Sequence, residues 1–215
     1  NGHTVTQIFD RNNRLISTIH PAEDGNAART RTTTVGYDDV GNRTSVKDAE
    51  GRTTTYTYDS LGNPLTQTIT DTGGGSGNSG TTRTTTWTYH ASGLVATETA
   101  PNGATTSYQY DSAGNLTSAT NALGHVDTYT HDGAGRVLTH TAPTGLVSTY
   151  TYDARGRMLT ANRGGQLTTL TYRPSGQVAT VTTPYGHTTS YSYDAAQRLK
   201  GWSDNRGHSG SYVLD

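Results

Sequence analysis

The chain has 215 residues, of which 30% are hydrophobic and 15% charged, and its mean hydropathy is -0.71. Both fractions fall below the roughly 45–50% apolar and about 25% charged content of ordinary globular domains, so a thick two-layer core is not expected. The net charge of -1 argues against a nucleic-acid-binding surface, and the absence of Cys excludes disulfides and thiolate metal sites. No apolar run is long enough for a transmembrane helix or a signal peptide.

An aromatic residue followed by Asp recurs along the chain at a nearly constant spacing. The second member of the pair, or its replacement, falls at Asp10, Asp38, Asp59, His90, Asp111, Asp132, Asp153, Arg173, Asp194 and Asp215. Six of the nine intervals between these positions are 21 residues, and the two long ones carry insertions. So regular a period predicts an array of about nine repeats over residues 9–215, with residues 1–8 as a lead-in from a preceding repeat. Because the chain begins at Asn1 without Met, we expect it to be a piece of a longer protein.

Each repeat contains two turn signals. The first is an aromatic residue, Asp, two variable residues and Gly followed by Asn or Arg, as in the segment from Tyr110 to Asn115. Asp can accept a hydrogen bond from the backbone two residues further on, and Gly tolerates the left-handed conformation that closes a bulged hairpin. A second Gly follows the first by nine or ten residues, as Gly124 follows Gly114. We name the first signal the Tyr-Asp turn and the second the opposite turn; each repeat should therefore hold two strands.

The segments between the turns have the residue types and alternation of β-strands. Residues 53–58 read Thr-Thr-Thr-Tyr-Thr-Tyr, and successive strand residues point to opposite faces. This predicts Thr and Ser ladders on one face and an aromatic ladder on the other, formed by Tyr56/Tyr58, Trp87/Tyr89, Tyr108/Tyr110, Tyr129/His131, Tyr150/Tyr152 and Tyr191/Tyr193. The return strand begins with an aliphatic residue at Leu15, Val95, Leu116, Val137, Met158, Val178 and Leu199, whereas Arg43 and Pro64 depart from that rule. No segment has helical periodicity, so the chain is expected to be all β.

The two insertions, near residues 21–31 and 73–80, both lengthen an opposite turn. The length of the Tyr-Asp turns is thus nearly constant, whereas the opposite turns tolerate insertions. About 18 strands at roughly 4.8 Å spacing would make a sheet about 86 Å wide. Flat sheets of that width are rare, so we expect the sheet to coil and to keep two open edges that pair with further chain.

Residue types that could carry chemistry are present, but their spacing favours structural roles. The eight His residues lack a metal-binding spacing, although His125, His187 and His208 each follow the Gly of an opposite turn and could be brought together by stacked repeats. His131 precedes Asp132, but it replaces a ladder Tyr, which favours a substitution within the repeat over a catalytic pair. The in-register Asp residues could in principle bind Ca²⁺, yet one carboxylate per turn favours turn capping. We predict no catalytic, cofactor or metal residues.

The segment Tyr-Asp-x-x-Gly-Asn-Leu-Thr at Tyr110 to Thr117, with its 21-residue recurrence, resembles the RHS/YD-repeat family from about Phe9 to Asp215. In that family the hairpins spiral into a hollow β-cocoon, and bacterial members enclose a C-terminal toxin that a self-cleaving segment releases. No Asp-Pro pair occurs here, so that segment is not expected in this chain. The resemblance implies an all-β, spiralling sheet that is part of a cocoon or solenoid. Its signature residues are Tyr37, Asp38, Gly41, Asn42, Tyr58, Asp59, Gly62, Asn63, Tyr110, Asp111, Gly114, Asn115, Tyr152, Asp153, Gly156, Tyr193 and Asp194.

The resemblance implies a structural shell segment of a secreted or cell-surface bacterial protein that encapsulates and carries a C-terminal toxin or effector, not an enzyme and without a cofactor. Its partners would be flanking repeats or further copies and the enclosed toxin, not nucleic acid and not a membrane-spanning segment. The alternative is an extracellular adhesin or fibre that binds carbohydrate or self-associates, because exposed Tyr rings can stack on sugars. A glycosidase is a third hypothesis. Such an enzyme needs two carboxylates that face each other across a cleft, whereas the carboxylates of this chain lie in turns.

Overall fold

A computed structural model describes residues 4–22, 30–71 and 80–213 of the chain. The chain divides into two compact units, residues 1–107 and 108–215, and each is described by itself. The described residues form nineteen β-strands and no helix, as the alternating pattern predicts. No helix long and apolar enough to cross a membrane is therefore found among them.

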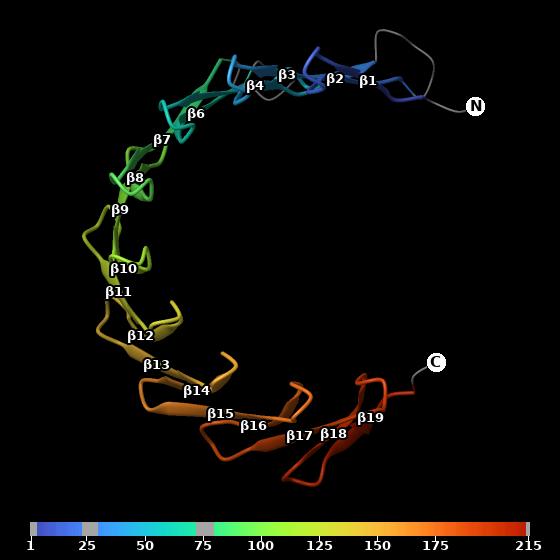
Figure 1. The fold of residues 1–215 in the computed structure, drawn as a ribbon, viewed down its shortest axis with the longest axis vertical. Coiled ribbons are helices and arrows are strands. Elements are labelled where there is room, and N and C mark those ends of the chain that lie inside the picture. The colour runs from blue at the N-terminus through green and yellow to red at the C-terminus, as the bar shows by residue number, and fades with distance from the viewer. Residues whose placement is uncertain (1–3, 23–29, 72–79, 214–215) are drawn as a thin grey trace. The chain divides into compact units, whose positions relative to one another are not determined.

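The strands follow the repeat (Figure 1). The first unit contains β1 Thr6–Phe9, β2 Leu15–His20, β3 Arg31–Tyr37, β4 Arg43–Lys47, β5 Thr53–Tyr58, β6 Pro64–Thr70, β7 Thr82–Tyr89 and β8 Val95–Thr99, and β9 Thr105–Tyr110 spans the boundary. The second contains β10 Leu116–Thr120, β11 Val126–His131, β12 Val137–Thr141, β13 Val147–Tyr152, β14 Met158–Arg163, β15 Gln166–Tyr172, β16 Val178–Thr182, β17 Thr188–Tyr193, β18 Leu199–Asp204 and β19 Ser209–Ser211. Within each unit every strand pairs antiparallel with the next one in the chain.

The hairpins closed by Tyr-Asp turns share one register. In the β5–β6 pair Thr57 lies opposite Thr66, but Tyr58 lies opposite Pro64, so a bulge falls beside the turn. The Gly that ends the turn, Gly62, has a φ of +86°, which a side chain rarely tolerates. Two turns use other residues at this position, because Asn13 has a φ of 60° and Gln197 a φ of 67°. The left-handed conformation therefore belongs to the repeat and is kept even where Gly is replaced.

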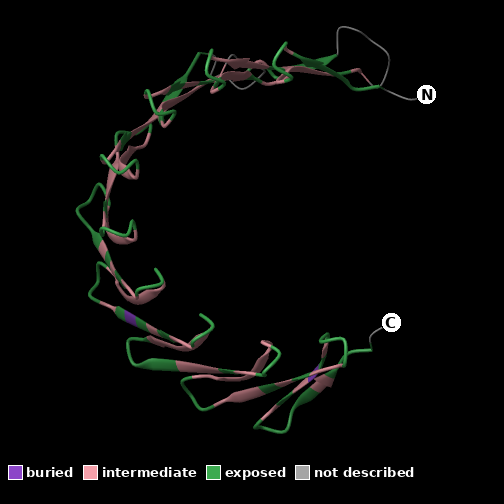
Figure 2. Ribbon diagram, in the orientation of Figure 1, coloured by how far each residue is buried: buried purple, intermediate pink, exposed green. Residues whose placement is uncertain are grey.

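Each unit is a single layer of strands. Among the described residues no hydrophobic side chain is fully buried, and Ser148 is the one buried polar residue, with 6% of its surface exposed. Figure 2 shows half-buried strands and exposed turns, without a second layer covering either unit. The expectation from composition that no thick core forms is confirmed for these residues.

The insertions predicted near residues 21–31 and 73–80 lie mostly outside the described residues. β2 ends at His20 before the first and β3 begins at Arg31 after it, and Thr70 and Thr82 flank the second in the same way. Both fall at the end of the hairpins away from the Tyr-Asp turns. β1 begins at Thr6, inside the segment expected to be a lead-in, which brings the strand number to nineteen instead of about 18. The division into a lead-in and an array stays a prediction.

Candidate functional site

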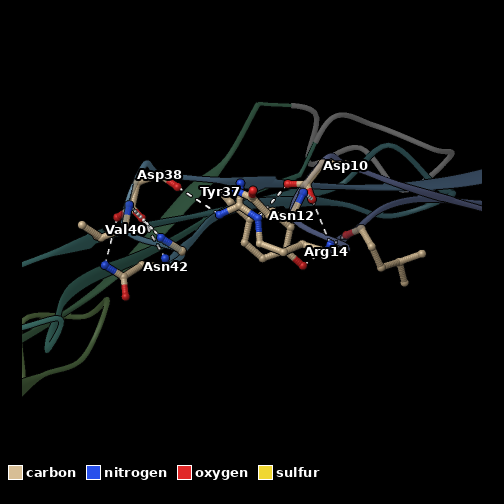
Figure 3. Close-up of polar contacts among 9 residues, drawn as sticks. Asp10, Asn12, Arg14, Tyr37, Asp38, Val40 and Asn42 are labelled. Atoms are coloured by element: carbon tan, nitrogen blue, oxygen red, sulfur yellow. Dashed lines mark hydrogen bonds and ion pairs between the residues drawn. The ribbon is translucent and has the colours of Figure 1, made fainter.

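The Tyr-Asp turns that contain Asp are closed by the side chain of that Asp. Asp38 Oδ1 accepts hydrogen bonds from the backbone amides of Val40, at 3.1 Å, and Asn42, at 2.7 Å, and Oδ2 accepts one from Asn42 Nδ2 at 2.9 Å (Figure 3). Asp59 repeats these contacts, and the side-chain and backbone hydrogen bonds from Asn63 hold the pKa of Asp59 below its ordinary value. The oxygens that could have bound Ca²⁺ are thus engaged by their own turns.

Where Arg follows the turn Gly position, its side chain reaches into the neighbouring repeat. Arg14 Nε donates to Asp10 Oδ2 at 2.7 Å, and its Nη1 donates to the Asp38 carbonyl at 3.2 Å (Figure 3). The guanidinium lies 4.6 Å from the ring centroid of Tyr37, within the range of a cation–π contact. Arg136 and Arg157 make the same three kinds of contact in the second unit. One side chain therefore joins two successive turns.

The second aromatic residue of each pair forms a further link between repeats. Tyr152 donates its hydroxyl hydrogen to the Val137 carbonyl at 2.9 Å, and Tyr172 and Tyr193 donate to the carbonyls of Met158 and Val178. In the first unit the same bond joins Tyr37 to Leu15, Tyr58 to Arg43 and Tyr89 to Pro64. Each acceptor begins the return strand of the preceding repeat. Because the acceptor is a backbone carbonyl, Arg43 and Pro64 can occupy the aliphatic position and keep the bond.

His131 interrupts this series. It stands where other repeats have the hydroxyl-bearing Tyr, and its ring is too short to carry a donor to the same place. Its Nδ1 is buried and has no hydrogen-bond partner among the described residues. Asp132, the next residue, is bound to Arg136 within its own turn at 2.6 Å. The interpretation of His131 as a substitution within the repeat stays a prediction.

Threonine hydroxyls pair across the strands on the other face. Thr57 and Thr66 lie 2.7 Å apart between their Oγ1 atoms, and Thr151 and Thr160 lie 2.6 Å apart. Pairs between successive hairpins, such as Thr182 with Thr188 at 2.9 Å, continue the pattern. Thr57 lies between Tyr56 and Tyr58 on one strand, so the hydroxyls face away from the aromatic side chains. The Thr ladder predicted from alternation is present.

Of the three histidines that follow the Gly of an opposite turn, two are brought together and the third is not. His187 and His208 both contact Asp204, whereas His125 donates its backbone amide to Asn121 in its own turn. No group of three or more His, Cys, Asp or Glu residues in the described ranges could hold a metal ion.

The predicted signature residues occupy equivalent places in their repeats. Each signature Tyr ends a strand, each signature Asp begins a turn, and each signature Asn donates to the Asp of its turn. The four signature glycines, Gly41, Gly62, Gly114 and Gly156, have φ values from 80° to 103°. Sequence reasoning did not include the linking arginines in this set, although the alternation of Asn and Arg after the turn was visible. They are Arg14, Arg136 and Arg157.

Comparison with known proteins agrees with this geometry. The RHS Repeat family profile matches residues 37–76, 89–126, 110–146 and 131–168. No curated protein matches the chain. Crystal structures of TcdB2-TccC3-Cdc42 and of TcdB2-TccC3 superpose with a TM-score of 0.76 at 17% and 18% identity, covering 92% of this chain and 12% of theirs.

A structure of the Photorhabdus luminescens Tc holotoxin pore superposes with a TM-score of 0.66 at 16% identity, covering 96% of this chain and 14% of that one. The chain thus spans only 12–14% of the length of the solved chains that it matches, and at these identities the likeness shows the fold alone. The family profile covers more than half of the residues, and the matched segments contain the Tyr-Asp turns that begin at Asp38, Asp59, Asp111, Asp132 and Asp153. The chain belongs to the RHS repeat family.

Proposed function

We propose that this chain is a segment of the wall of a hollow shell, built by a longer RHS-repeat protein, that encloses and carries a C-terminal toxin or effector outside the producing bacterium. The observation that carries the proposal is the single layer of strands, in which no hydrophobic side chain of the described residues is fully buried. Such a layer cannot be stabilised by an interior core. Its stability has to come from the strand pairing and from the Tyr, Arg and Thr contacts that join each repeat to the next.

The chemistry of the layer suits a wall that meets solvent or cargo on both sides. One face carries paired Thr hydroxyls, and the other carries half-buried aromatic rings. The first strand, β1, pairs on one side with β2, and its Ile8 and Phe9 are 42% and 48% exposed. An edge of this kind is suited to pairing with a further strand of the parent chain. We propose flanking repeats as the direct partners and the enclosed domain as the cargo.

The comparisons support this proposal through the fold. The solved chains of the same fold come from TcdB2-TccC3 and from a Tc holotoxin pore, whose name is that of a toxin assembly and which also contains TccC3. We propose no catalytic role for the segment, since the carboxylates of the Tyr-Asp turns are bound by their own backbone amides and by Asn or Arg side chains. The wall would then act by enclosing its cargo and not by modifying it.

Cryo-electron microscopy of the longest intact parent protein tests the proposal. We expect a closed shell with these residues in its wall and with additional density inside. Limited proteolysis of the same particle should leave the region that follows the repeats uncut until the shell is unfolded. A straight filament built from repeated copies, with that region cleaved at once, would contradict the shell and support an adhesin or fibre.

A further inference from the structure

Two neighbouring opposite turns of the second unit meet in a cluster of ionisable side chains. His187 ends the turn between β16 and β17, and Asp204 and His208 begin and end the turn between β18 and β19. His187 Nε2 lies 3.0 Å from Asp204 Oδ2, and His208 Nδ1 lies 2.9 Å from the same oxygen. The Asp204 side chain is only 5% exposed. Two imidazole rings thus share one enclosed carboxylate oxygen.

Asn205 joins the same two turns directly beside this cluster. Its Nδ2 donates to the Gly186 carbonyl at 2.7 Å, and its backbone amide donates to the Thr188 carbonyl at 3.0 Å. The Thr188 amide donates in return to Asn205 Oδ1 at 3.2 Å. These three bonds hold one repeat against the next, so whatever strengthens the carboxylate–imidazole contacts also stabilises the junction.

The first unit contains the same contact with a permanent charge. Arg52 follows the Gly of its turn as His187 does, and Asp71 begins the next opposite turn as Asp204 does. Arg52 Nε lies 2.8 Å from Asp71 Oδ1, and Arg83 Nη2 lies 2.9 Å from Asp71 Oδ2. Arg keeps its charge at every physiological pH, whereas His gains its charge between about pH 8 and pH 5. The cation at the junction therefore has a fixed charge in the first unit, whereas in the second unit its charge depends on pH.

We propose that His187, Asp204 and His208 form an acid-responsive clamp between neighbouring repeats. Uptake of one proton by the two imidazoles at mildly acidic pH converts a hydrogen bond from a neutral imidazole to the Asp204 carboxylate into an ion pair in which both partners are charged, which is stronger. The junction held by Asn205 then opens less often. A second proton would place two cations on one carboxylate, so the singly protonated cluster is the tight state. The clamp does not depend on whether the parent protein forms a closed shell.

Asp204 is the carboxylate that both imidazole rings of the cluster contact, and the other charged groups nearby are few. Arg206, in the same turn, donates its backbone amide to Asp204 Oδ1 at 3.0 Å. The other ionisable side chains of strands β16 to β19 and of the turns that join them are Tyr185 in the turn of His187, Tyr191 on β17, Lys200 on β18 and Tyr212 after β19, with Tyr193, Asp194 and Arg198 at the opposite end of the hairpins. The hydrogen bond from His187 is the largest cause that holds the pKa of Asp204 far below its ordinary value, so the carboxylate stays ionised at mildly acidic pH.

Amide hydrogen exchange followed by NMR on the whole chain tests the clamp. Protection of the Asn205 and Thr188 amides, each referred to the unfolded-chain rate at the same pH, is measured at pH 7.5 and pH 5.5. We expect protection to rise about fivefold on acidification, as an imidazolium replaces a neutral imidazole beside the ionised Asp204. His187→Arg should keep the high protection at both pH values, and His187→Gln should keep the low one.

Two internal controls separate the clamp from a general effect of pH. The Gly145 amide donates to the Ala142 carbonyl in an opposite turn that has no carboxylate, so its protection should not change. Arg52→His should give the Asp71 amide of the first unit a new dependence on pH. The proposal is overturned if Asn205 shows no rise in the native chain, if His187→Gln shows the same rise, or if Gly145 rises by the same factor.

Discussion

The hydroxyl of Tyr152 offers a direct test of how the repeats are held together. Tyr152→Phe removes the hydrogen bond to the Val137 carbonyl, 2.9 Å long, and keeps the ring under the Arg136 guanidinium. A neutral hydrogen bond contributes about 0.5–1.5 kcal/mol, and because Tyr152 is only half-buried, water can replace part of it. We expect the free energy of unfolding to fall by about 0.5–1 kcal/mol. In urea this corresponds to a midpoint lower by roughly 0.3–0.5 M at a slope of about 2 kcal/mol/M.

Tyr150→Phe is the matched control. Tyr150 lies on the same strand, on the same face, and is equally half-buried, but its hydroxyl makes no hydrogen bond within the described residues. Its removal should change the urea midpoint by less than about 0.1 M. Combining Tyr152→Phe with the same change at Tyr172 and Tyr193 should lower stability by about 2 kcal/mol, since the three bonds join different repeats. Equal effects of Tyr150→Phe and Tyr152→Phe would refute the reasoning.

Three further outcomes are expected. His131→Tyr should raise the free energy of unfolding by about 0.5–1 kcal/mol, because the new hydroxyl can reach the Leu116 carbonyl as in other repeats; an unchanged urea midpoint would contradict this. Gly135→Ala should cost about 1–2 kcal/mol in a urea titration, since Gly135 has a φ of 77° and its Cβ would lie 2.8 Å from Asn115 Oδ1, whereas Gly133→Ala in the same turn should cost nothing. The turn carboxylates, Asp153 among them, have pKa values lowered in the folded chain, so their stabilisation is complete above about pH 4 and is lost as the pH falls further; a urea midpoint that stays constant from pH 5 to pH 3 would exclude this.

The local rules of the repeat could be predicted from the sequence because they depend on residues close to one another in the chain. Asp followed four residues later by Asn or Arg defines a turn whose hydrogen bonds are all local. Alternation within the segment ending at Tyr58 fixes which side chains share a face. The strand pairing follows, since each hairpin fixes the register of the next. The all-β fold and the family were predictable for this reason.

The contacts between repeats were not predictable from the same rules. The acceptor of Tyr152 is a backbone carbonyl fifteen residues away, and no residue type at Val137 indicates it. The position of Arg14 over Tyr37 depends on the offset between two successive turns, which the strand twist sets and the repeat spacing does not. His187 and His208 share one carboxylate because Asp204 begins its opposite turn, a position that Ala100, Asn121, Ala142 and Thr183 occupy in four others. The repeat pattern therefore predicts the contacts within one repeat, but not the contacts made where a repeat departs from the pattern.

Within each unit a strand pairs only with its neighbours in the chain, and this has a mechanical consequence. A chain pulled from its two ends would open such a sheet one hairpin at a time, because each step loads only the bonds of the last hairpin and not those of the whole layer. Each released repeat of 21 residues would add about 70 Å of extended chain. The force would therefore rise and fall once per repeat, and the Tyr hydroxyl and Arg contacts would set the height of each step.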